Sequence, residues 1–275
     1  MSHPVTSIIT TGDAVANEET RLSICLRADG FSFSVATLDG ILLTVGDCRP
    51  DGWKLDATAA RRVADTVTDA RDLALGYRQM QLIIPTTQFT WVPEHLFDAS
   101  RVHQYLHFVA EVDEEANAYH IYSPAIKAYM VFAAPDALVT PFKVALPGID
   151  VHNQHSALVT EHLLQASAGH PVILMHVRDG VADIEAMYNG QLLLSNSYDA
   201  NGEEELLYHA LNVMKRLHLE TPDMDLKICG NVDRSIYARL SRFFPNVTLY
   251  TGIPHRYLNP EFETLHTYRH ALILS

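Results

Sequence analysis

The sequence predicts an α/β protein built from two similar halves, because the same pattern of short strands and turns occurs twice. Residues 22–47 (LSICLRADGFSFSVATLDGILLTVGD) and 172–198 (VILMHVRDGVADIEAMYNGQLLLSNSY) each hold three β-branched and apolar runs separated by turn dipeptides. The dipeptides are Asp29-Gly30 and Asp39-Gly40 in the first stretch, and Asp179-Gly180 and Asn189-Gly190 in the second. Each pair of equivalent glycines is 150 residues apart. Such dipeptides favour type I′ hairpin turns, so each half is expected to open with a three-stranded antiparallel meander.

An amphipathic helix is predicted after each meander. Apolar residues recur at helical spacing over residues 56–75 in the first half and over residues 203–217 in the second. Short apolar runs at residues 80–84 and 226–229 then predict one strand in each half.

The remaining segments complete the two halves. In the first half we expect strands near residues 89–92, 119–122, 129–133 and 148–151, and helices over residues 100–109 and after Pro135. In the second half we expect a helix over residues 235–244 and a strand at residues 247–250. The order β-β-β-α-β-α-β would then occur twice. We therefore expect one domain over residues 1–155, a second over residues 156–275 with a C-terminal tail, and an apolar helix at residues 157–164 near their junction.

Composition excludes several classes of function. Twenty Lys and Arg against 33 Asp and Glu give a net charge of −13, which disfavours nucleic acid and anionic lipid as partners. No apolar run is long enough to cross a bilayer, and the first residues do not resemble a signal peptide. The three cysteines lie in apolar contexts and favour a reducing, cytoplasmic location.

The duplicated order resembles the actin-like ATPase superfamily, whose two ribonuclease-H-like domains face each other across a nucleotide cleft. Three segments resemble its pilus-assembly and secretion-platform branch: QLIIPTTQFTWVP beginning at Gln81, AYMVFAAPDAL at residues 128–138, and LPGIDVHNQHSALVTEHLL at residues 146–164. The chain also resembles an uncharacterised bacterial family with this fold and no established activity. The resemblance implies the duplicated ribonuclease-H-like fold and a nucleotide site.

The phosphate-binding motifs that the resemblance implies are degenerate. The superfamily's first phosphate loop resembles Asp-x-Gly-Ser/Thr, with the aspartate holding hydrated Mg²⁺. Two residues before Gly30 stands Ala28, and two residues before Gly180 stands Arg178. Asp29, Gly30, Asp179 and Gly180 therefore mark the positions of the motifs without their full pattern, and ordinary turns explain them better.

The adenosine motif is reduced in the same way. A strand followed by Gly-Gly-Gly/Ser is typical of the superfamily, whereas this chain has Gly230-Asn231. Glu203, Glu204 and Glu205 would also repel a phosphate near the second helix. No cofactor is therefore expected, with Mg-ATP kept as the alternative.

Other candidate sites rest on single patterns. His103 and His107 are spaced i, i+4, as are His266 and His270, and surface histidines explain both pairs better than a metal site does. Cys229 precedes a helix but is interpreted as a buried apolar residue. A nuclease would need clustered carboxylates, and Asp29, Asp179 and Asp183 are not expected to cluster.

The leading hypothesis is a non-catalytic interaction or scaffold protein with a protein partner. The alternative is a divergent ATP-binding or phosphotransfer enzyme in which Asp29 or Asp179 holds Mg²⁺. A sugar or acetate kinase is a third class, which would need a substrate pocket between the two domains that a sequence by itself does not reveal.

Overall fold

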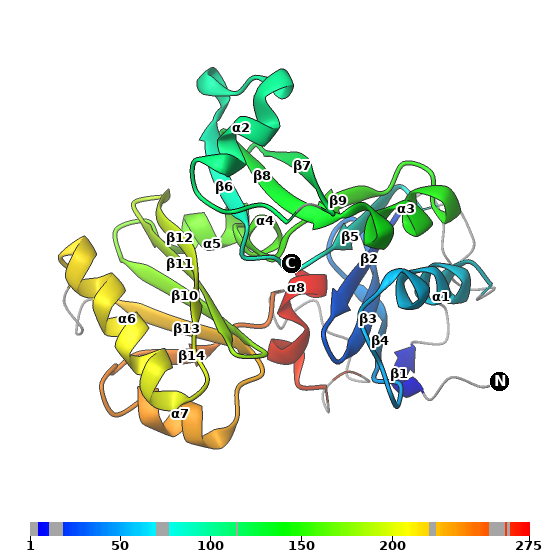
Figure 1. Cartoon of the computed structure of the whole chain (residues 1–275). Coiled ribbons are helices and arrows are strands. Elements are labelled where there is room, and N and C mark those ends of the chain that lie inside the picture. The colour runs from blue at the N-terminus through cyan, green and yellow to red at the C-terminus, as the bar shows by residue number, and fades with distance from the viewer. Residues whose placement is uncertain are drawn as a thin grey trace. The chain divides into compact units, whose positions relative to one another are not determined.

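A computed structural model describes residues 5–10, 19–69, 77–113, 115–219, 224–252, 262 and 265–275 (Figure 1). These residues form two compact units. The first contains the described residues up to Ser156 together with Leu272–Leu274, and the second contains Ala157–Gly252 and His266–Ala271.

The first unit contains two sheets. The larger has the order β1-β4-β3-β2-β5-β9, and the smaller has the order β6-β8-β7. The strands are β1 (Val5–Thr10), β2 (Thr20–Arg27), β3 (Gly30–Thr37), β4 (Leu42–Cys48), β5 (Gln79–Ile83), β6 (Phe89–Pro93), β7 (Ala116–Ser123), β8 (Ala128–Pro135) and β9 (Asp150–His152). Its helices are α1 (Ala57–Asp69), α2 (Val102–His107), α3 (Asp136–Ala145), α4 (Gln154–Leu158) and α8 (Ala271–Leu274). The boundary between the units falls within α4, after Ser156, and α8 belongs to this unit from Leu272 onward. Strand β1 was not expected from the sequence.

The second unit repeats the larger sheet with the order β12-β11-β10-β13-β14. Its strands are β10 (Val172–Arg178), β11 (Val181–Tyr188), β12 (Gln191–Asp199), β13 (Asp225–Gly230) and β14 (Val247–Leu249). Its helices are α5 (Glu161–Ala166), α6 (Glu203–Leu217) and α7 (Arg234–Leu240). The meander strands, β2–β4 in the first unit and β10–β12 in the second, are antiparallel. The next two strands of each large sheet, β5 and β9 or β13 and β14, run parallel to the first meander strand. The two mixed α/β sheets with equivalent meanders confirm the predicted duplication.

The strand register refines the correspondence between the repeats. Arg27 pairs with Gly30, and Arg178 pairs with Val181, so the first two strands are offset by 151 residues (178 − 27) instead of 150. A register shift follows Val35 in the first meander and Ala186 in the second, again 151 residues apart. The shared irregularity shows that the two meanders match in detail as well as in strand order.

The predicted turn type was wrong at three of the four dipeptides. Asn189 and Gly190 both have positive φ, of 52° and 72°, as a type I′ turn requires. At Asp29, Asp39 and Asp179 the aspartate does not have a positive φ. The first hairpin turns at Ala28-Asp29 instead, and Gly30 begins β3.

Gly30 allows β3 and β4 to approach each other closely. A Cβ atom on Gly30 would lie 2.0 Å from the carbonyl oxygen of Cys48, and its φ is 155°. The glycine is therefore needed where β3 passes β4, and its position in a turn dipeptide does not report its role.

Helices cover one face of each large sheet. In the first unit the core joins apolar residues of β2 and β3 to α1 and α3 (Figure 1), and in the second it joins β10 and β11 to α6. The opposite face of the first sheet receives the C-terminal segment, since Ser34 Oγ donates to the carbonyl oxygen of Ile273 at 2.6 Å.

The single helix expected at residues 157–164 is instead two short helices, α4 and α5. Thr160 separates them in an extended conformation, and its side chain accepts a hydrogen bond from the backbone N–H of Leu163. A threonine that caps a new helix interrupts the preceding one. The helix expected over residues 56–75 runs through α1, and residues 70–75 lie outside the described residues.

None of the helices in the described part of the chain combines the length and the apolar character needed to cross a bilayer.

Candidate functional site

Each repeat places an arginine at the last residue of its first strand, where the phosphate loop was expected. Arg27 ends β2 and Arg178 ends β10, so the 151-residue offset makes them equivalent. Both arginines are paired with carboxylates, but the carboxylates come from different strands.

In the first unit two arginines and two aspartates form one network. Arg27 Nε lies 3.0 Å from Asp29 Oδ1, and its Nη2 donates to Asp47 on β4. Arg49 reaches Asp29 at 3.4 Å and Asp47 at 3.3 Å. Burial lowers the pKa of Arg27, but the carboxylates of Asp47 and Asp29 outweigh it and raise that pKa overall. Both carboxylates are thus already neutralised at this turn.

In the second unit the network lies inside the fold. Asp183 on β11 is 0% exposed and accepts from Arg178 Nε at 2.8 Å and Nη2 at 3.2 Å. His176 Nδ1 lies 3.0 Å from its carboxylate, and Ser197 Oγ donates to it at 2.6 Å. A buried charge with this many donors is a structural ion pair, because its oxygen lone pairs are directed at protein groups.

Cys229 lies beside this buried carboxylate and is not an activated thiol. It pairs with His176 across parallel strands and is 0% exposed. Burial, together with the charge of Asp183, raises its pKa. A thiol in this environment stays protonated at neutral pH, as the interpretation of Cys229 as a buried apolar residue requires. Cys25 and Cys48 are likewise buried, and all three cysteines are free.

The expected nucleotide positions fall into both units. Asp29 is held by the two arginines, and Gly30 is buried against β4. In the second unit Asp179 and Asn231 are exposed, and Asn231 Nδ2 donates to Asp179 Oδ1 at 3.3 Å.

Gly180 and Gly230 in the second unit have positive φ, of 71° and 87°. A Cβ on Gly230 would lie 2.2 Å from the carbonyl oxygen of Val177, so the chain is tightly packed where β13 ends. The structure therefore brings the Asp179 turn and the Gly230-Asn231 loop together within one unit.

The histidine pairs behave differently from each other. His103 and His107 lie on α2 at the surface, whereas His270, expected at the surface, is only 7% exposed. The tail packs against the second unit through Tyr268, which explains the burial. Within the described ranges no three His, Cys, Asp or Glu side chains are grouped to hold a metal ion.

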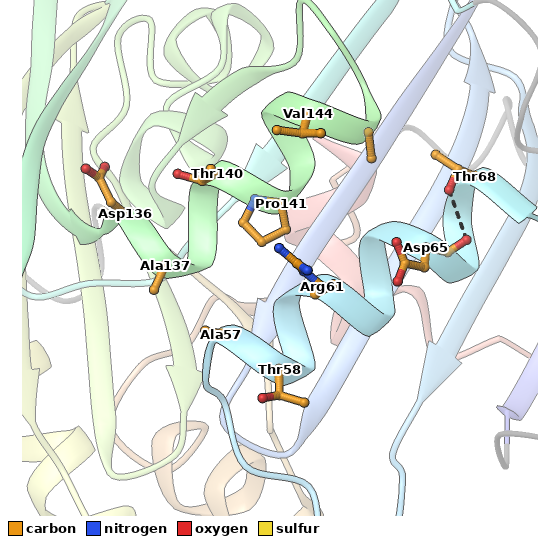
Figure 2. A pocket seen from close by; sticks show the side chains of 11 residues that line it. Ala57, Thr58, Arg61, Asp65, Thr68, Asp136, Ala137, Thr140, Pro141 and Val144 are labelled. Atoms are coloured by element: carbon orange, nitrogen blue, oxygen red, sulfur yellow. Dashed lines mark hydrogen bonds between the residues drawn. The ribbon is translucent and has the colours of Figure 1, made fainter.

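A hollow of about 1110 Å³ lies between α1 and α3 on the first unit (Figure 2). Its walls are mostly small or apolar: Ala57, Thr58, Ala137, Thr140, Pro141, Val144 and Ala145. Arg61 extends from α1 toward Pro141, and Val144 is 76% exposed. At the start of α3, hydrogen bonds donated by Tyr119 and, to a smaller extent, by Asn117 lower the pKa of the Asp136 carboxyl. The hollow therefore combines small and apolar walls with one cationic side chain, Arg61, and two carboxylates, Asp65 and Asp136.

The sequence motifs did not identify the side chains that surround the turn aspartate of the first unit and the buried aspartate of the second. These are Arg27, Asp47 and Arg49 in the first unit and His176, Arg178 and Ser197 in the second. The detectable signal was the alternation of polar residues along a strand, since Asp183 and Glu185 share one face of β11. The partners lie on neighbouring strands, and only the register brings them together.

Comparison with solved structures gives the fold. A protein of unknown function with an actin-like ATPase fold from Bacteroides thetaiotaomicron superposes with a TM-score of 0.69, at 20% identity over 90% of this chain and 95% of that chain. The PilM-PilN type IV pilus biogenesis complex gives a TM-score of 0.61, at 12% identity over 92% and 96% of the two chains. The predicted resemblance to the actin-like ATPase superfamily and to its pilus-assembly branch is confirmed at the level of the fold.

Comparison with curated protein sequences gives no match. A family model described as a protein of unknown function, DUF3822, matches residues 10–247. The chain therefore belongs to the DUF3822 family and has the actin-like ATPase fold.

Proposed function

We propose that this protein is a non-catalytic member of the actin-like fold that binds another protein in the cytoplasm. The observation that carries the proposal is the ion network at the first hairpin. Asp29 and Asp47 face Arg27 and Arg49, so the carboxylates at the expected phosphate loop are engaged by protein cations. A carboxylate that must hold hydrated Mg²⁺ needs open oxygen lone pairs.

Protein binding is supported by the hollow between α1 and α3. Small side chains leave it open, and Val144 in its wall is exposed. Exposed apolar surface rimmed by polar residues is typical of protein-binding sites. The PilM relative is itself known in a complex with PilN, which supports a similar use of the fold here.

Calorimetry with Mg-ATP tests the non-catalytic part. We expect no saturable heat at millimolar nucleotide and no phosphate release. Micromolar binding that disappears in Asp179→Ala would contradict the proposal.

Affinity capture with the tagged full chain tests the protein-binding part. We expect one partner to be retained by the parent and lost by Val144→Glu, which places a charge at the hollow. Val109→Glu is the matched control, because Val109 is also more than half exposed and lies outside the hollow. Equal capture by both variants would remove the hollow from the proposal.

The second candidate function is a divergent ATP-binding or phosphotransfer enzyme. One observation favours it: the exposed carboxylate of Asp179 lies beside the Gly230-Asn231 loop in the same unit. The Asp179→Ala calorimetry above separates the two functions, because only the second requires this carboxylate.

A further inference from the structure

Strand β7 leaves one long edge of the small sheet unpaired. In the order β6-β8-β7 it pairs with β8 on one side, and no strand of the described chain pairs with its other side (Figure 1). Its eight residues, Ala116–Ser123, include no Asp, Glu, Lys, Arg or Pro, and its ladder with β8 has no register shift. Alternate N–H and C=O groups of such a strand point outward and can pair with another strand.

The other edge strands among the described residues carry protection that β7 lacks. β9 and β14 have three residues each, and β6 ends at Pro93. β1 and β12 border ladders with a register shift, and β12 also contains Asp199, whose carbonyl oxygen lies 3.0 Å from His209 Nε2. Short length, proline, charge and bulges are the usual devices against edge pairing. The regular, uncharged edge of β7 is therefore an exception within the described part of this molecule.

The charges at the two ends of β7 are complementary. Glu111, Asp113 and Glu115 are exposed just before the strand, and Lys127 is exposed in the turn after it. An antiparallel second copy would bring each Lys127 to the acidic end of the other β7. A parallel copy would instead place acidic end against acidic end, which is unfavourable.

We propose that two copies of this chain associate through antiparallel pairing of their β7 strands. A two-fold axis perpendicular to the sheet makes the interface self-complementary and joins the two small sheets into one continuous sheet. This axis relates each face of the sheet to the same face in the second copy. The central residue of β7, Tyr119 or His120, therefore lies opposite the same residue of the other copy. The pairing requires neither the proposed partner protein nor nucleotide.

Light scattering of the full chain over a concentration series at about 0.15 M salt, where exposed charges are largely screened beyond the Debye length, measures the association. We expect a mass of twice the 30.7 kDa chain at the upper concentrations. His120→Glu places two like charges at the centre or diagonally across it, depending on which of the two residues faces its own copy, and we expect it to weaken the dimer by about tenfold in Kd or more. His120 is exposed, with its ring 5.1 Å from that of Phe97, so the unfolding midpoint of the variant is measured to check that the fold is kept.

A charge exchange tests the predicted direction of pairing. Lys127→Glu is expected to weaken the dimer, and the double variant Lys127→Glu, Asp113→Lys is expected to restore it. Leu193→Lys is the matched control, because Leu193 is exposed on the other long edge strand, β12, and should leave the mass unchanged.

Three results would overturn the proposal. The parent could remain a monomer at every concentration, the dimer could be lost in Leu193→Lys but retained in His120→Glu, or the double charge variant could fail to recover. The chain could also be a monomer in which the β7 backbone amides are protected from hydrogen exchange only when another protein is bound. In that case the β7 edge pairs with a strand of a different protein, and self-association would again be overturned.

Discussion

The two repeats place equivalent arginines on equivalent strands and neutralise them differently. Arg27 is paired with Asp47 from the third strand and with Asp29 from the turn, all partly exposed. Arg178 is paired with Asp183 from the second strand, which is 0% exposed. The 151-residue offset places Ser32 of the first repeat at the position of Asp183, so one repeat has a small hydroxyl where the other has a buried charge. The two arginines are about equally exposed, at 19% and 21%, so the same topology holds partly exposed carboxylates in one unit and a fully buried carboxylate in the other.

The consequences for stability differ because burial sets the cost of losing a partner. Exposed ion pairs contribute little, whereas a buried charge that loses its counterion is strongly destabilising. Substitutions in the two networks should therefore differ in their cost to stability.

The largest effect is expected for Asp183→Ala. It leaves the buried His176 and the partly exposed Arg178, whose side chain is 21% exposed, without their common carboxylate, which should lower the free energy of unfolding by about 3–5 kcal/mol. Urea unfolding measures the change. Asp183→Asn, which keeps the size and one acceptor oxygen, should cost less, and an equal loss in both variants would show that packing matters more than charge.

The next largest effect is expected for Gly230→Ala beside the same network. The new methyl would meet the carbonyl oxygen of Val177 at 2.2 Å and His176 Cδ2 at 2.9 Å. Overpacking of about 1–3 kcal/mol should add to the backbone strain of about 1–2 kcal/mol that a positive φ imposes. Gly169→Ala is the control, because Gly169 has a φ of 75° and open space around it. Equal losses in the two variants would remove the close contact from the explanation.

A pH effect is expected from the first unit, where the largely buried His152 contacts neutral Ser156, in contrast to His176 with its carboxylate. Burial lowers the pKa of His152 to about 4 from 6.5 in the unfolded chain, with Arg21 adding to the shift and Asp150 opposing it.

Between pH 6.5 and 4 the unfolded chain therefore binds a proton at His152 that the folded chain does not. This contribution to stability is complete above about pH 6.5 and declines toward about pH 4, by about 3 kcal/mol. Urea unfolding of the parent and of His152→Gln at about pH 7 and about pH 4.5 should show a smaller decline in the variant. Equal declines would contradict the assignment.

The smallest effect is expected for Asp47→Ala in the Arg27 network. Arg27 keeps Asp29 as a partner, and the Asp47 side chain is 14% exposed whereas that of Asp183 is 0% exposed, so water replaces part of the lost bond. We expect a loss of about 1–2 kcal/mol, well below that of Asp183→Ala. Thermal unfolding of the two variants side by side gives the ratio, and a loss as large as that of Asp183→Ala would remove the contrast between the units.

Much of the fold was predictable because it depends on local patterns. The predicted helix over residues 203–217 coincides with α6, since its apolar stripe, acidic first turn and basic last turn all favour the same segment. The hairpin positions were predictable for a similar reason. The single helix at residues 157–164 was not found, because Thr160 favours a new helix start over continuation.

The candidate site was less predictable. Asp29, Gly30, Asp179, Gly180, Gly230 and Asn231 were identified from superfamily motifs, yet the charged groups around them come from other strands. Asp-Gly marks a turn but does not specify which residues pair across it, and a shift of one residue changes the face on which every side chain lies. This is why the equivalence of Arg27 and Arg178 was not visible at an offset of 150.

The sequence by itself determined the duplicated order of strands and helices, the acidic balance and the loss of the superfamily's phosphate-loop pattern, because these depend on neighbouring residues and on composition. Only the tertiary structure decided which arginine meets which aspartate, which of the two networks is buried, and which strand remains as an open edge. These properties depend on strand register and on solvent access, and both arise only when segments distant in the chain pack together.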